Sequence, residues 1–192
     1  MTTRDDAAMV ADSVVQALRL GFSVLHPTML IEQRGANLGQ VALPDPADME
    51  RLEMDTAYPV SDPWDVIVLV HRTFYELTGE VVERDDYGNW MLAGPAQVPV
   101  FVSVRSDYPV VRVWARLVRG ISEGKAALRE MNILNRDADR VRFNVGHDAL
   151  WAQFEVTCGP FVPRHVQTAV ALVADAAGAV SEDFALRTGG VV

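Results

Sequence analysis

Residues 98–119 read VPVFVSVRSDYPVVRVWARLVR, and this stretch decides the fold. Two runs rich in β-branched residues flank the polar turn sequence SDYP, a pattern typical of adjacent strands joined by a turn. In the second run, which begins at Val110, aliphatic residues alternate with Arg112, Trp114 and Arg116. The alternation predicts a strand with one buried face and one solvated face, as in an antiparallel sheet.

The segment before this stretch carries the clearest helix signals. Asp62 suits the N-cap position, Pro63 the first helical position, and Gly79 the residue just past the helix end. These signals predict a helix over residues 63–78 with an apolar stripe on one face.

Turn and periodicity signals place the remaining elements of the chain. Hairpin-like turns are expected over residues 85–89 and at Gly146-His147-Asp148, and Ser122 suits the cap of a further helix. The inner stripe of that helix is expected to be Ala127, Leu128, Met131 and Leu134. Strands are predicted over residues 81–84, 90–93, 98–105, 110–119, 140–145 and 149–157, and helices over residues 122–135 and from Pro163 to about Leu186.

Strands grouped between helices indicate the α+β class, with an antiparallel sheet of about five strands flanked by helices. We expect one domain over residues 62–188 and a frayed tail over residues 189–192. Residues 1–61 are expected to form an N-terminal extension, with a helix over residues 6–25, a possible hairpin over residues 29–43 and an acidic, proline-containing linker.

Charge and cysteine content narrow the classes of function. The net charge of −9 disfavours nucleic acid as a partner. The basic exception is the segment over residues 105–142, with a local balance of about +4, which is either solvated surface or a dock for an acidic partner. A lone cysteine, acids near the N-terminus and short apolar runs predict a cytoplasmic protein that does not enter a membrane.

The residues that most often carry chemistry do not form a recognisable site. The histidines at positions 26, 71, 147 and 165 lack the spacing of metal ligands, and Cys158 is expected to be a buried structural residue. Asp85 and Asp86 occupy a predicted turn, where aspartate bonds to the local backbone. We therefore predict no catalytic residue, no metal site and no cofactor.

Tryptophan and arginine suggest a partner-binding surface instead. These two residue types contribute most of the binding energy in protein interfaces. Trp114 and Trp151 lie on the side of their predicted strands opposite the aliphatic residues, so they are expected to face outward. The alternative is that such outward tryptophans pack under a covering helix or under the N-terminal extension. The residues predicted to bind a partner are Trp90, Arg112, Trp114, Arg116 and Trp151.

The order of elements, together with the stretches VPVFVSV, VVRVWARL and ALREMNILN, resembles the YbjN family and the related type III secretion chaperones. The third stretch ends with Met131 to Asn135, similar to a phrase that follows the third strand in that family, and Gly146 to Asp148 match its next turn. The resemblance spans residues 62–188. It implies a non-enzymatic, peptide-binding domain that is often dimeric.

Three hypotheses of function follow. The first is a peptide- or protein-binding chaperone or adaptor, forming a homodimer and acting through a sheet and helix surface. The second is a small-molecule sensor or enzyme with a pocket between the N-terminal extension and the sheet. The third is a structural subunit of a larger assembly.

Overall fold

The computed structural model describes residues 41–94, 98–122 and 124–192. The helix expected over residues 6–25 lies outside these residues. So does the possible hairpin over residues 29–43, apart from its last three residues, which form no strand. His26 also lies outside the described residues.

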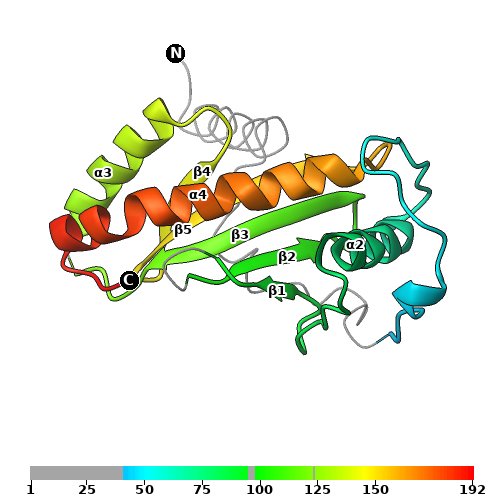
Figure 1. Ribbon diagram of the computed structural model, residues 1–192. Coiled ribbons are helices and arrows are strands. Elements are labelled where there is room, and N and C mark those ends of the chain that lie inside the picture. The colour runs from blue at the N-terminus through cyan, green and yellow to red at the C-terminus, as the bar shows by residue number, and fades with distance from the viewer. Residues whose placement is uncertain (1–40, 95–97, 123) are drawn as a thin grey trace, which may run out of the picture. The chain divides into compact units, whose positions relative to one another are not determined.

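A five-stranded antiparallel sheet forms the centre of the domain (Figure 1). Its spatial order is β1-β2-β3-β5-β4, and every neighbouring pair is antiparallel. The predicted α+β class and sheet are therefore confirmed. The strands are β1 (Trp90–Leu92), β2 (Val100–Val104), β3 (Val110–Val118), β4 (Arg142–Gly146) and β5 (Ala149–Thr157).

Three helices and one short 3-10 turn complete the described elements. They are η3 (Pro46–Asp48), α2 (Pro63–Thr78), α3 (Gly124–Asp137) and α4 (Pro163–Thr188). The predicted ends of α2 are confirmed: the Asp62 carboxylate accepts a hydrogen bond from the amide of Asp65 at 3.0 Å, and Gly79 ends the helix with φ of 74°. None of the described helices is long and apolar enough to cross a membrane.

The long helix α4 lies across the sheet beside α2 (Figure 1) and packs mainly on β3 and β5. Small and β-branched residues at helical spacing let its backbone approach the strands closely. The fully buried positions of this stripe are Val166, Ala169, Val173 and Ala177. They meet the aliphatic residues of β3, and this contact forms the core.

The predicted strand over residues 81–84 is wrong. Arg84 forms a single bridge with Trp90, and the side chain of Val81 is exposed. The turn explains the difference. The Asp85 carboxylate accepts hydrogen bonds from the amides of Tyr87 and Asn89, and Arg84 Nε donates to the carbonyl of Gly88. Before the turn, therefore, only Arg84 pairs with β1, and residues 81–83 form no strand.

Two expectations for the second half of the chain also fail. Leu128 was expected on the inner stripe of α3 but is 50% exposed, because α3 buries only Ala127 completely. The tail is not frayed: the amides and carbonyls of Val191 and Arg119 bond to each other at 2.8 and 2.9 Å.

The outer edge of the sheet, strand β4, is held by a side chain of α3. The amide group of Asn135 donates to the carbonyl of Phe143 and accepts from its N–H, both at 2.8 Å. One asparagine therefore satisfies both backbone groups of Phe143 that β5 does not reach.

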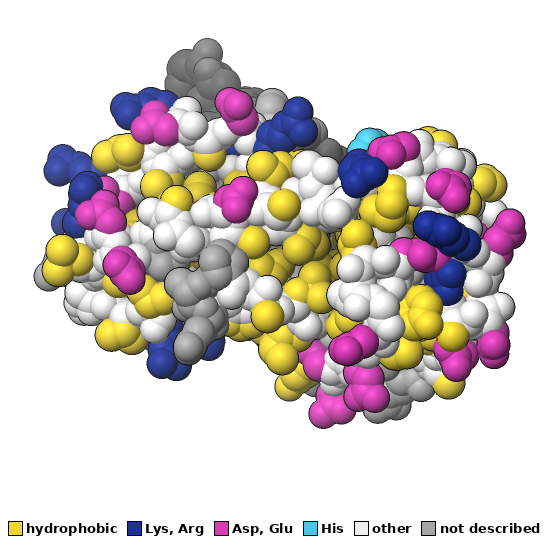
Figure 2. Space-filling model, viewed as in Figure 1, with side chains coloured by type: hydrophobic (Ala, Val, Ile, Leu, Met, Phe, Trp, Pro, Cys, Tyr) yellow, Lys and Arg dark blue, Asp and Glu magenta, His cyan; other side chains and the backbone are white. Residues whose placement is uncertain are grey.

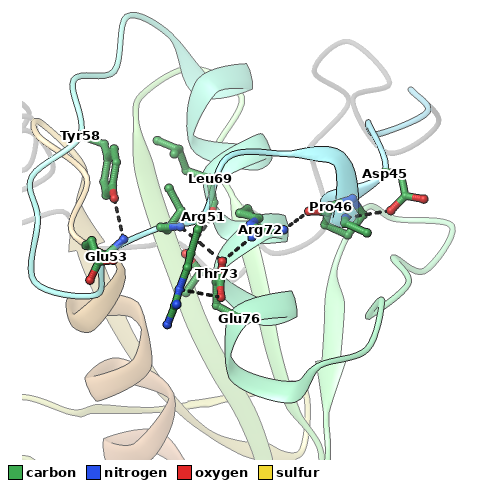
Figure 3. A network of polar contacts seen from close by, with 11 residues as sticks. Asp45, Pro46, Arg51, Glu53, Tyr58, Leu69, Arg72, Thr73 and Glu76 are labelled. Carbon is green, nitrogen blue, oxygen red and sulfur yellow. Dashed lines mark hydrogen bonds and ion pairs between the residues drawn. The ribbon is translucent and has the colours of Figure 1, made fainter.

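The segment predicted as a linker is packed structure. We call residues 45–60 the strap. It runs beside α2, where Arg72 donates to the carbonyl of Pro46 and pairs with Glu76, which in turn accepts from the amide of Leu52 (Figure 3). The expected domain boundary at residue 62 therefore falls inside packed structure.

The far end of the strap is tied to the start of α4. Tyr58 and Phe161 exchange backbone hydrogen bonds at 2.8 and 2.9 Å, and Arg164 binds the carboxylate of Asp55 through two nitrogens at 3.0 Å. The strap thus joins α2 to α4, two helices separated by the whole sheet in sequence.

We predict that Arg72→Met lowers the free energy of unfolding by about 2–4 kcal/mol, because the change removes the buried ion-pair partner of the half-buried Glu76 carboxylate and the side-chain donor to the Pro46 carbonyl. Urea unfolding measures the loss. Arg136→Met is the matched control: it removes a solvent-exposed pair with Asp137 and should leave stability unchanged. Equal effects of the two substitutions would contradict the structural role of Arg72.

Candidate partner-binding surface

The sheet has a second face, opposite the one that contacts α2 and α4. Strand pleating places alternate residues of β3 on it, and cross-strand pairing extends it over β2 and β5. We call this surface the open face. Its residues are Phe101, Ser103, Arg112, Trp114, Arg116, Trp151, Gln153 and Glu155.

Three aromatic side chains cross the open face as a row. Phe101 and Trp114 stack with ring centroids 4.4 Å apart and planes 15° apart, and Trp151 continues at 5.6 Å from Trp114. All three are partly exposed. We call Phe101, Trp114 and Trp151 the aromatic row. Neighbouring rings hold one another in place, so the row offers a preordered apolar surface.

A pocket of about 440 Å³ opens beside the aromatic row. Its apolar lining includes Val98, Pro99 and the three rings, and its polar lining is formed by Arg116 and Arg119. The Arg116 guanidinium carbon lies 5.9 Å from the centroid of the Trp151 ring, within the range of a cation–π contact. The pocket therefore combines aromatic walls with positive charge.

Three of the five residues predicted to bind a partner come together here. Trp114, Arg116 and Trp151 lie side by side on the open face and line the same pocket. Phe101 was not among the predicted residues, although it alternates with Val100 and Val102 on a predicted strand. That alternation was the available signal.

The other two predicted residues, Arg112 and Trp90, are buried. Arg112 is on the open face, but it is only 5% exposed, and its Nε lies 3.1 Å from Glu155 on β5. Trp90 is fully buried in an edge-to-face contact with Phe74, because its register opposite Val102 turns it toward the helices. Trp90 therefore has no exposed surface through which to contact a partner.

The described histidines are separate from one another. His71 is buried on α2, and burial, followed by the nearby charge of Arg84, lowers its pKa. His147 and His165 are exposed. Within the part of the chain that the structure describes, no three His, Cys, Asp or Glu side chains are grouped as metal ligands would be.

Cys158 is a buried core residue, as predicted. Its thiol donates to the carbonyl of Val156 at 3.3 Å, and burial raises its pKa to about 11. Nucleophilic cysteines need a lowered pKa and access to solvent, and this thiol has neither. The Asp85 carboxylate accepts hydrogen bonds from backbone amides of its own turn, as expected.

We predict that Cys158 resists alkylation in the folded protein. With a pKa of about 11, only about one thiol in a thousand is ionised at pH 8. Iodoacetamide labelling, followed by intact mass, should be at least about 100-fold slower in native buffer than in urea. Because the folded pKa is above the ordinary value of 9.0, the free energy of unfolding should fall as pH rises above 9. Rapid labelling of the native chain at pH 8 would contradict this assignment.

Comparisons with known proteins extend the structural description. A family model described as the type III secretion (YopN, CesT) and YbjN peptide-binding chaperone 1 family matches residues 65–192. No curated protein sequence matches the chain.

Solved structures with a similar fold include the complex of ExsC with ExsE, at 15% identity and a TM-score of 0.50 over 62% of this chain and 95% of that one. The Yersinia pestis type III secretion chaperone SycH, bound to a fragment of YscM2, has 15% identity and a TM-score of 0.45 over 58% and 96%. The HopA1–SchA chaperone–effector complex has 9% identity and a TM-score of 0.49 over 62% and 95%.

Proposed function

Because the chain belongs to the family of type III secretion and YbjN peptide-binding chaperones, we propose that it binds an extended segment of a client protein on its open face. The observation that carries the proposal is the aromatic row, whose three neighbouring rings are partly exposed on the sheet. Extended peptides commonly dock on sheet surfaces, where side-chain pockets provide specificity.

The composition of the open face supports this proposal. Tryptophan and arginine are the residues most enriched among interface hot spots, and here Trp114, Trp151 and Arg116 line one pocket. Rings already fixed by stacking lose little conformational freedom when a ligand arrives, so more of the contact energy is available for binding. The solved complex of ExsC with ExsE, which has a similar fold, is consistent with a protein client.

We place the activity in binding alone, without a catalytic step. The single thiol is buried and protonated, and the exposed histidines lie on separate elements. The lone cysteine favours action in the cytoplasm.

We also propose that the protein forms a homodimer through α3. This helix completely buries only Ala127, while Leu128 is 50% and Ile133 is 38% exposed. Exposed large apolar residues on a helix that borders the edge strand are suited to contact with a second copy.

To test the client-binding surface, we would select peptides of about twelve residues from a random library on the immobilised full chain. Trp114→Ala should weaken binding of the selected peptides at least about tenfold by fluorescence anisotropy, because truncating a central aromatic anchor typically costs about 2 kcal/mol or more. The matched control is Tyr87→Ala, which removes an aromatic ring that is 88% exposed in the turn before β1. Equal affinities for wild type and Trp114→Ala, with both folded by circular dichroism, would reject the open face as the binding surface.

To test the dimer, we would compare light scattering of the wild type with that of Leu128→Glu/Ile133→Glu. Charges at these two positions of α3 should convert the dimer to a monomer, because a buried carboxylate without a partner is costly. Leu186→Glu, at a leucine that is 84% exposed on α4, is the control and should leave the dimer intact. A wild-type monomer at all concentrations would refute the homodimer.

A further inference from the structure

Two arginines at the pocket have no acidic partner among the residues that the structure describes. Within residues 41–94, 98–122 and 124–192, neither Arg116 nor Arg119 lies within ion-pair distance of an aspartate or glutamate. Both side chains line the 440 Å³ pocket beside the aromatic row. Positive charge is thus concentrated where a ligand has aromatic walls to pack against.

Two carboxylates next to strand β3, one on β5 and one in the turn between β2 and β3, already have partners. Glu155 pairs with Arg112 at 3.1 Å, and Asp107 binds Arg105 through both oxygens at 2.9 and 3.1 Å. The hydrogen bonds from Arg105 lower the pKa of Asp107, so this carboxylate stays ionised and stays paired. Arg116 and Arg119 therefore remain the charges with which a ligand can pair.

The chain outside the basic segment 105–142, which supplies both pocket arginines, has the opposite charge. The whole chain carries a net charge of −9, and acidic side chains gather at the lower right of the helix side, where the segment between α2 and β1 lies (Figure 2). An acidic ligand is thus disfavoured over most of the surface and favoured at this pocket. Such a contrast gives selectivity for one site, because like charges elsewhere oppose competing contacts.

The geometry sets the spacing of the groups that a ligand should carry. In an extended peptide, side chains two residues apart lie on the same side, about 6.6 Å from each other. The cation of Arg116 and the ring centre of Trp151 are 5.9 Å apart, which is close to that repeat. A large apolar side chain resting on the aromatic row would thus place a carboxylate two positions away at the guanidinium.

From these observations we propose that the pocket binds acidic client segments in which a large apolar residue and an aspartate or glutamate stand two positions apart in extended conformation. This inference rests on the proposed function and specifies its ligand. The apolar side chain packs on the rings, and the carboxylate pairs with Arg116 or Arg119.

The test uses fluorescein-labelled peptides of about twelve residues and the full chain, at one fixed salt concentration. The first peptide repeats leucine or phenylalanine with aspartate or glutamate two positions away. The second replaces each acid by its amide, asparagine or glutamine. The third has the composition of the first, with each acid moved to the adjacent position. We expect the first peptide to bind at least tenfold more tightly than the second, with the third between them.

Charge variants connect that preference to the pocket. Arg116→Gln/Arg119→Gln should reduce the ratio of acidic to amide affinity to about one, whereas Arg129→Gln/Arg140→Gln, which removes the same net charge from exposed positions on α3 and the following loop, should keep it. Arg116→Lys keeps the charge and should retain part of the preference. Since all four arginines are exposed, the variants should fold, and thermal melting verifies this.

Each outcome decides a different claim. Equal affinity for the acidic and amide peptides, with both weakened by Trp114→Ala, would overturn the acidic ligand and leave client binding on the open face intact. Loss of the preference in both double variants would assign it to net charge and also overturn the inference. Peptide binding that falls as protein concentration rises would show that a second copy occupies the face instead. Failure of the random library to yield any binder would count against the proposed function itself.

Discussion

The pleat of strand β3 is the constraint on which the rest of the structure depends. Under α4, β3 buries Val111, Val113, Ala115 and Leu117, and because successive side chains point to opposite faces, the intervening residues must lie on the other side. A slip of one residue would bring charge into the core and send the aliphatic residues to the surface. The energy of core packing therefore also fixes where Trp114 and Arg116 stand. The position of the proposed binding surface is therefore a consequence of how the core packs.

Local signals in the sequence were enough for most of the fold. Helix α2 follows from Asp62, Pro63 and Gly79, and the turn between β4 and β5 places His147 and Asp148 at positive φ, as a tight hairpin turn requires. The strap was not predictable in the same way, because the hydrogen bond from Arg72 to the carbonyl of Pro46 spans 26 positions in sequence. Proline-rich, acidic segments have linker composition, and only the tertiary partners show that this one is packed.

The candidate surface was likewise predictable where local sequence determines it and not where distant contacts do. Alternation within β3 identified Trp114 and Arg116, but the aromatic row also requires the register of β2 and β5, which brings Phe101 and Trp151 to either side of Trp114. Alternation also predicted correctly that Arg112 lies on the open face. It could not predict that Arg112 is buried there in an ion pair with Glu155, which is 43 positions away in sequence. Trp90 was misplaced because three residues of strand are too few for a pattern to identify the face. The burial of a side chain depends on neighbours that a single strand cannot specify.

Asn135 has a consequence for the behaviour of the protein at high concentration. A strand at the border of a sheet exposes backbone donors and acceptors to which any other chain can add, and this addition is the usual first step of fibril growth. The amide of Asn135 occupies that position on β4 by imitating the next strand at Phe143. For a chain that belongs to a peptide-binding chaperone family, such protection matters, because extended segments are the molecules that can add to a sheet edge. At Phe143, Asn135 occupies one pair of backbone groups to which another strand could add.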